Sequence, residues 1–182
     1  MNLPNLLTLT RVLLIPVFVI FIIDKSYLYA LITFAIAGIT DGIDGLIARL
    51  THQKTELGAY LDPIADKLLL LSGFIALAIT EILPSWIAVI VITRDVIILM
   101  GIFVMILINR RPKIQPSLVS KLTTDFQIAT VLLALLRMYY PFFNLLSTVA
   151  IYGTALLTII SGSHYIYVGT RILNQKKSTR MT

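Results

Sequence analysis

Residues 85–108 read SWIAVIVITRDVIILMGIFVMILI, a stretch whose only charged side chains are those of Arg94 and Asp95. About 20 consecutive apolar residues cross the hydrocarbon core of a bilayer, so this stretch is long enough for a transmembrane helix. Charged side chains within a bilayer are costly and usually face the interior of a helical bundle. The stretch therefore predicts a membrane helix that holds Arg94 and Asp95 as a neutralised pair or presents them to a polar cavity.

The composition extends this prediction to the whole chain. Of its 182 residues, 58% are hydrophobic and 13% are charged, and the mean hydropathy is +0.92. Soluble domains are about half apolar and about a quarter charged. Further stretches of suitable length lie at residues 5–23, 27–50, 62–81, 117–139 and 143–170. We expect an all-α integral membrane protein with six transmembrane helices in one domain, residues 1–182.

The distribution of basic residues predicts the orientation. They gather in alternate connections and in the C-terminal tail, at Lys54, Arg110, Arg111, Lys113, Lys176, Lys177 and Arg180. Cytoplasmic loops carry an excess of Lys and Arg, so we expect a protein of the cytoplasmic (inner) membrane with both termini in the cytoplasm. The net charge of +6 is expected to meet anionic lipid headgroups rather than nucleic acid.

Two absences narrow the possibilities further. The first apolar stretch has no basic residue before it and no small-residue cleavage site after it, so we expect it to remain as a helix. The chain contains no cysteine, which excludes disulfides and thiolate metal sites.

Four acidic residues, Asp41, Asp44, Asp62 and Asp66, lie near the predicted cytoplasmic ends of the second and third helices. Residues three or four positions apart share one face of a helix, so each pair projects from one side. An antiparallel turn between these helices can bring the two pairs together. Close carboxylates repel one another unless a cation neutralises them, and oxygen ligands favour Mg²⁺, Mn²⁺ or Ca²⁺. We predict a site for two divalent cations.

These acids also permit two other interpretations. Asp62 precedes Pro63, a pattern typical of a helix N-cap followed by proline at the first helical position. Carboxylates inside a membrane also occur along the path of a divalent-cation transporter. A transport path needs polar residues through the depth of the bundle, whereas these acids gather at one end, so we favour an enzyme.

The acidic segment reads Asp41-Gly-Ile-Asp44-Gly45-Leu-Ile-Ala48-Arg49, then eight residues, then Gly58-Ala-Tyr-Leu-Asp62-Pro-Ile-Ala-Asp66. This pattern resembles, position for position, the D-x-x-D-G-x-x-A-R-x8-G-x3-D-x3-D signature of the CDP-alcohol phosphatidyltransferases. Membrane prenyltransferases also use two acidic clusters, but they lack the glycine, alanine and arginine at these spacings. The opening Pro4-Asn5-Leu-Leu-Thr8-Leu-Thr-Arg11 is similar to the same family.

The resemblance implies an activity and a set of residue roles. Family members transfer a phosphatidyl group from CDP-diacylglycerol to an alcohol and release CMP, in a polar cavity that faces the cytoplasm. It implies two divalent cations, Mg²⁺ or Mn²⁺, bound by Asp41, Asp44, Asp62 and Asp66, with Asp66 also acting as the catalytic base. It implies a CDP site lined by Asn5, Asp41, Gly45, Ala48, Arg49 and Gly58. It also implies a homodimer.

The acceptor is expected to meet Arg94, Arg110, Ser120 and Lys121. Family members that use glycerol 3-phosphate generally carry two further cations, at positions that are Ile102 and Thr123 in this chain. The stretches around Arg94 and Lys121 resemble the cardiolipin synthases of the family, whose acceptor is phosphatidylglycerol. A phosphodiester has one negative charge and needs fewer cations, so we expect phosphatidylglycerol, with glycerol 3-phosphate as the alternative.

Overall fold

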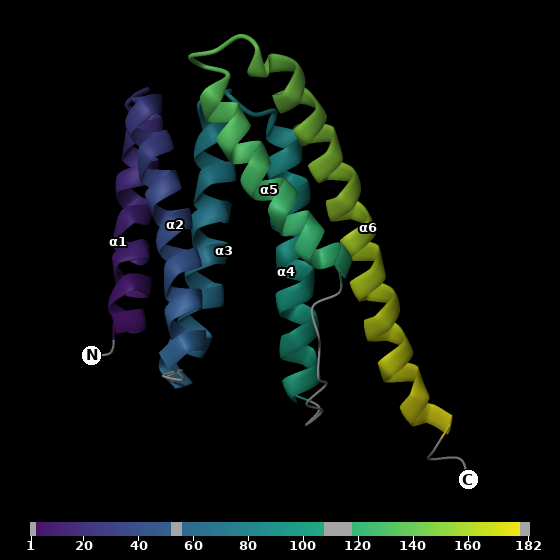
Figure 1. Ribbon diagram of the computed structural model, residues 1–182. Coiled ribbons are helices and arrows are strands. Elements are labelled where there is room, and N and C mark those ends of the chain that lie inside the picture. Colours follow the sequence, from purple (N-terminus) through teal and green to yellow (C-terminus); the bar gives the residue numbers. More distant parts are fainter. Residues whose placement is uncertain (1–2, 52–55, 108–117, 179–182) are drawn as a thin grey trace.

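The computed structural model describes the backbone of residues 3–51, 56–107 and 118–178, and the side chains of residues 8–42, 63–101, 104 and 118–171. Within these ranges the chain forms six helices and no strand (Figure 1). The helices are α1 (Leu3–Ile23), α2 (Tyr27–Thr51), α3 (Glu56–Ile79), α4 (Ser85–Leu107), α5 (Leu118–Leu136) and α6 (Phe143–Ser178). The all-helical class predicted from the sequence is confirmed.

Each predicted apolar stretch corresponds to one helix, with two differences at the ends. Helix α3 begins at Glu56, so Asp62 and Pro63 lie within it, and the interpretation of Asp62 as an N-cap is wrong. Proline removes a single backbone donor, and the helix continues through it. Helix α6 continues to Ser178, beyond the predicted end at residue 170.

The six helices form two groups of three. Helix α1 packs on α2 and α3, whereas α6 packs on α4 and α5. Fewer contacts join the two groups: α3 touches α4, and α5 touches α2 and α3. Figure 1 shows α1, α2 and α3 on one side and α4 and α6 on the other. Helix α1 begins and α6 ends at the same end of the bundle (Figure 1). This agrees with the predicted placement of both termini on one side of a membrane.

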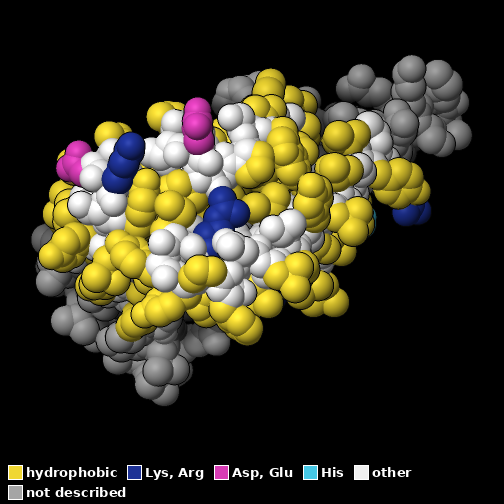
Figure 2. All heavy atoms as spheres, turned by 90° about the horizontal axis from the view of Figure 1, so that it is seen from above, with side chains coloured by type: hydrophobic (Ala, Val, Ile, Leu, Met, Phe, Trp, Pro, Cys, Tyr) yellow, Lys and Arg dark blue, Asp and Glu magenta, His cyan; other side chains and the backbone are white. Residues whose placement is uncertain are grey.

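Apolar side chains cover much of the exterior. Large hydrophobic residues are exposed on every helix, among them Leu13, Ile79, Leu99, Leu122 and Ile159. Figure 2 shows one end of the bundle, where hydrophobic side chains surround a few charged ones. Among the described residues, Leu118–Leu136 and Phe143–Arg171 are long and apolar enough to cross a membrane. An apolar exterior of this kind is expected of helices surrounded by lipid.

Polar side chains lie inside the bundle instead. The fully buried ones include Thr8, Arg11, Thr123, Gln127, Thr130, Ser147, Thr154, Thr158 and Ser161. Most of them belong to α5 and α6, where the hydroxyls of Thr130 and Thr154 are hydrogen-bonded at 2.8 Å. The hydrocarbon of lipid offers polar groups no hydrogen bonds, which favours their position inside the bundle. The side chains of Gln127 and Thr158 have no hydrogen-bond partner among the described residues.

At the end of the bundle opposite to the chain termini, Arg137 joins two of the connections between helices. It follows α5 and donates hydrogen bonds to the carbonyl of Ile82, between α3 and α4, and to Ser147 Oγ of α6 at 3.4 Å. Burial lowers the pKa of Arg137 from its usual range. Lys25 and Glu81 follow α1 and α3 with φ of 59° and 60°, the left-handed conformation that ends many helices. The hydrogen bonds of Arg137 and the two left-handed residues therefore define the conformation of the turns at this end.

The first group of helices depends on a close approach at Gly73. A Cβ atom at this position of α3 would lie 3.1 Å from Cε1 of Phe18, a fully buried ring of α1. We expect Gly73→Val to destabilise the protein by about 1–3 kcal/mol, the usual effect of overpacking. The measurement is the thermal unfolding midpoint in detergent at a fixed scan rate. Gly38→Val is the matched control, because Gly38 of α2 is exposed and no atom lies within 4 Å of its Cβ position. Equal midpoints for the two variants would contradict this packing.

Candidate active site

A fully buried arginine joins the three helices of the first group. Nη1 of Arg11, on α1, lies 2.9 Å from Oδ1 of Asp41 on α2 and 2.6 Å from Oδ1 of Asp66 on α3. The side chain of Arg11 is 0% exposed, whereas those of Asp41 and Asp66 are 46% and 41% exposed. Two of the four aspartates predicted to act together are thus brought to one point by α1.

The other two aspartates lie on the same helices. Asp44 belongs to α2 and Asp62 to α3, but their side chains lie outside the described residues. Among the side chains that the structure does describe, no three of the His, Cys, Asp and Glu residues are grouped around one point. The four-carboxylate cluster therefore stays a prediction.

The described carboxylates fit a hard cation. Nη1 of Arg11 contacts one oxygen of Asp41 and one of Asp66, so the two side chains converge on the guanidinium of this arginine. Both carboxylates remain partly exposed. Mg²⁺ and Mn²⁺ prefer oxygen ligands and usually retain water, which such an open carboxylate pair allows.

Arg11 had no role in the site predicted from the sequence, although a signal for one was present. An arginine inside an apolar stretch must meet an internal partner, because it is too costly to leave in lipid. The sequence alone does not identify that partner, since Asp41 and Asp66 are 30 and 55 residues away and only the packing of α1 brings them close.

Most of the residues expected at the CDP site cannot be compared with the structure. The side chains and surroundings of Asn5, Gly45, Ala48, Arg49 and Gly58 lie outside the described residues, as does Arg110 of the expected acceptor site. Their predicted roles stay predictions. Asp41 is the one residue of that set whose side chain is placed, beside Arg11.

A second buried arginine joins the helices of the other group. Arg94 of α4 is 4% exposed and donates to Ser120 Oγ of α5 at 2.7 Å and to Ser161 Oγ of α6 at 2.9 Å. It also contacts Asp95 Oδ1 at 2.6 Å, and its guanidinium lies 5.9 Å from the ring centre of Tyr165. Two residues of the expected acceptor site, Arg94 and Ser120, are thus in direct contact.

An ion pair connects the two groups of helices. Lys67 of α3 follows Asp66, and its Nζ lies 2.6 Å from the Asp95 Oδ1 that also receives Arg94. Two cations therefore share one carboxylate, which leaves one positive charge in excess in this cluster of Lys67, Asp95 and Arg94. Lys121, the remaining expected acceptor residue, is exposed on α5 next to Ser120. The acidic and basic clusters meet at consecutive residues of α3.

The fold and the site define an all-helical, membrane-associated protein with an acidic centre. The sequence model of the CDP-alcohol phosphatidyltransferases matches residues 1–160, and the chain belongs to this family. It is 37% identical over 174 residues to a probable cardiolipin synthase (CMP-forming) of Drosophila melanogaster, covering 87% of this chain and 53% of that protein.

Two bacterial relatives are matched over more of their length. A probable phosphatidylglycerophosphate synthase of Mycobacterium tuberculosis is 37% identical over 172 residues, which cover 91% of this chain and 80% of the relative. A CDP-diacylglycerol–glycerol-3-phosphate 3-phosphatidyltransferase of Wigglesworthia glossinidia brevipalpis is 32% identical over 179 residues, which cover 95% and 97%. This chain spans about half of the fly protein and most of the bacterial ones.

The position of Arg11 generates a prediction about stability. Arg11→Met leaves two facing carboxylates without their shared cation, so we expect a loss of about 1–3 kcal/mol in metal-free buffer. This is less than the roughly 3–5 kcal/mol for a fully buried pair, because both aspartates are partly exposed. Added Mg²⁺ or Mn²⁺ should raise the thermal unfolding midpoint more in this variant than in the wild type. The control is Arg171→Met, at an exposed position of α6. An unchanged metal-free midpoint for Arg11→Met would show that the contact is not stabilising.

Proposed function

We propose that the protein transfers a phosphatidyl group from CDP-diacylglycerol to the hydroxyl of a glycerol-containing acceptor and releases CMP. The observation that carries this proposal is the convergence of Asp41 and Asp66, two residues of the family motif on two helices, on the guanidinium of Arg11. The relatives support it, because their names describe cardiolipin synthesis with CMP release and phosphatidyl transfer to glycerol 3-phosphate.

Two divalent cations, Mg²⁺ or Mn²⁺, are part of the proposal. Asp41, Asp44, Asp62 and Asp66 would hold them, and the cations would neutralise the diphosphate and polarise the phosphorus under attack. Asn5, Asp41, Gly45, Ala48, Arg49 and Gly58 would line the cytidine diphosphate site. The guanidinium of Arg49 suits phosphate oxygens because it can donate two parallel hydrogen bonds.

Asp66 is proposed as the base that takes the proton of the acceptor hydroxyl. Asp66 lies on α3 next to Lys67, whose ammonium contacts Asp95 beside Arg94. Asp66 is therefore the residue of the acidic centre that adjoins the expected acceptor site. A base must be within hydrogen-bond reach of the proton that it removes. Arg11 holds Asp66 on one oxygen and leaves the carboxylate partly exposed for this step.

The acceptor site is proposed at Arg94, Ser120 and Lys121, together with Arg110. Lys121 and Arg110 would add to the one excess positive charge of the Lys67, Asp95 and Arg94 cluster, so the site as a whole suits an anionic acceptor. Thr123 lies one turn beyond Ser120, is fully buried and donates to carbonyls of α5 and α6, so this position adds no second cation. We therefore favour phosphatidylglycerol, with cardiolipin as product, over glycerol 3-phosphate.

The membrane arrangement is also part of the proposal. The exposed apolar residues on all six helices support six membrane crossings. The basic connections of the sequence favour the inner membrane with cytoplasmic termini. Release of CMP on the cytoplasmic side fits this orientation, since CDP is soluble and the acyl chains are not. Homodimerisation stays a prediction from the resemblance.

The role of Asp66 can be tested by substitution. Asp66→Asn keeps the size of the side chain but cannot accept a proton, so we expect kcat for CMP release to fall by about 100-fold or more at saturating metal. The comparison is Asp24→Asn, an exposed acid between α1 and α2, which should turn over like the wild type. The unfolding midpoint of each variant controls for the lost contact with Arg11. Wild-type turnover by a folded Asp66→Asn protein would remove Asp66 from the base role.

The choice of acceptor is tested by competing substrates. Purified protein with CDP-diacylglycerol, Mg²⁺ and radiolabelled phosphatidylglycerol should form cardiolipin, whereas glycerol 3-phosphate should react slowly. The reason is that Thr123 and Ile102 supply no cation for the second negative charge of glycerol 3-phosphate, and each missing charge-assisted contact weakens binding by about 1.5–3 kcal/mol. Thin-layer chromatography of the lipids separates the two products. Efficient phosphatidylglycerophosphate formation without cardiolipin would reverse the acceptor assignment and leave phosphatidyl transfer intact.

A further inference from the structure

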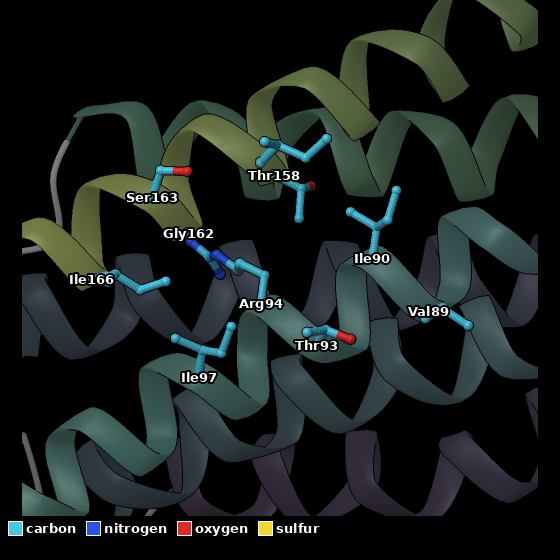
Figure 3. A pocket seen from close by; sticks show the side chains of 10 residues that line it. Val89, Ile90, Thr93, Arg94, Ile97, Thr158, Gly162, Ser163 and Ile166 are labelled. Carbon is cyan, nitrogen blue, oxygen red and sulfur yellow. The ribbon is translucent and has the colours of Figure 1, made fainter.

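A groove of about 270 Å³ runs between α4 and α6 (Figure 3). Its walls are mostly apolar, with Ile90 and Ile97 from α4 and Ile159 and Ile166 from α6. The hydroxyl-bearing Thr93 and Ser163 also line it. Val89, Ile159 and Ile166 are also exposed on the outside of the bundle or at its edge, so the groove opens sideways onto the apolar exterior. Its volume is slightly below the usual range for whole drug-sized ligands, which suits a segment of one hydrocarbon chain.

The floor of the groove is polar and incompletely bonded. Arg94 and Thr158 both line it, and Figure 3 shows the Arg94 side chain directed from α4 toward Gly162 of α6. Nε of Arg94 and Oγ1 of Thr158 are buried and have no hydrogen-bond partner in the part of the chain that the structure describes. Donors left without an acceptor in an apolar setting are unfavourable, so a ligand oxygen at this level would stabilise the site.

The charge of the floor indicates which ligand oxygen fits. Arg94 and Lys67 share the single carboxylate of Asp95, so the cluster beside the groove carries one positive charge in excess. A phosphodiester carries one negative charge and several acceptor oxygens. A helix from a second copy of this chain would cover the groove with apolar side chains. Such side chains have no negative charge and no acceptor oxygen to offer Arg94.

Aromatic side chains lie beyond the groove-lining residues on the side of the α3–α4 and α5–α6 connections. Trp86 of α4 and Tyr152 of α6 are in ring contact there, with centroids 5.9 Å apart. Toward the other end, Tyr165 lies against the Arg94 guanidinium at 5.9 Å. A chain in the groove therefore extends out through the side of the bundle, while its polar end stays at Arg94.

We propose that this groove is the lateral entry for a lipid acceptor, with one acyl chain between α4 and α6 and the phosphodiester at Arg94 and Thr158. The proposal rests on the proposed function and specifies the acceptor as an anionic lipid with a single phosphodiester. The expected donor residues belong to α1, α2 and the first turns of α3, in the other group of helices. The link from Arg94 through Asp95 to Lys67, next to Asp66, places the acceptor beside the proposed base.

The test uses phosphatidylglycerol with a diazirine on one acyl chain, bound to the full-length protein in lipid nanodiscs without CDP-diacylglycerol. We expect crosslinks in residues 89–97 and 158–166, with competition by unlabelled phosphatidylglycerol but not by glycerol 3-phosphate. Gly162→Leu fills the groove next to Arg94, whose Cγ would lie 3.6 Å from the new Cβ, and should reduce crosslinking about tenfold. Gly101→Leu is the matched control, because it adds the same volume to α4 where no atom lies within 4 Å.

A second variant covers the case in which Gly162→Leu fails to fold. Ile166→Trp narrows the mouth of the groove from an exposed position, and Ile160→Trp is its control at another exposed position of α6. Both Gly162→Leu and Ile166→Trp should raise KM for phosphatidylglycerol more than KM for CDP-diacylglycerol. Crosslinks spread evenly over the exposed helices, or unchanged by either variant, would overturn the proposal.

The outcomes also separate this proposal from the proposed function. Cardiolipin formation with crosslinks elsewhere refutes the groove and leaves the activity standing. Crosslinks in the groove without any cardiolipin formation refute its role as the acceptor entry. Protein–protein crosslinks between α4 and α6 of two copies, with no lipid labelling, would assign the groove to a dimer contact instead.

Discussion

Two buried arginines determine how this bundle is assembled. Arg11 contacts a carboxylate on each of its two neighbouring helices, and Arg94 contacts a serine hydroxyl on each of its two neighbours. Lipid offers neither arginine a hydrogen-bond acceptor, so each can be accommodated only if its partners converge on it. Each group of three helices therefore packs around one buried arginine, Arg11 in the first group and Arg94 in the second.

The surroundings of Arg11 and of Arg94 differ in net charge, and they meet on α3 at Asp66 and Lys67. Around Arg11 the described carboxylates exceed the cations by one, which favours added divalent cations. Around Arg94 the cations exceed the carboxylates by one, which favours an anion. Because Asp66 and Lys67 are consecutive, the proposed function would place a metal-bound diphosphate and an anionic acceptor on adjacent parts of α3.

Hydropathy predicted the helices well because each one needs a continuous apolar stretch, and the predicted ends agree with the structure to within a few residues in α1, α2 and α4. The start of α3 was wrong, because the local pattern Asp62-Pro63 suits a helix start as well as an interior proline. The pairing of Arg94 with Asp95 was foreseeable from adjacency, whereas its contacts with Ser120 and Ser161 depend on packing over 26 and 67 residues. For the same reason, the motif contains Asp41 and Asp66, whose roles stay predictions, but does not identify Arg11 as their partner.

The central claim is that the acidic centre carries out metal-dependent phosphatidyl transfer. The most direct measurement is CMP release by the purified wild-type protein in vesicles that contain CDP-diacylglycerol and phosphatidylglycerol, with EDTA and then with excess Mg²⁺ or Mn²⁺. We expect no CMP in EDTA and, on addition of the metal, CMP and a new phosphodiester lipid in equal amounts. CMP release at the same rate in EDTA, or divalent-cation flux across the vesicle membrane with no CMP release at all, would contradict it.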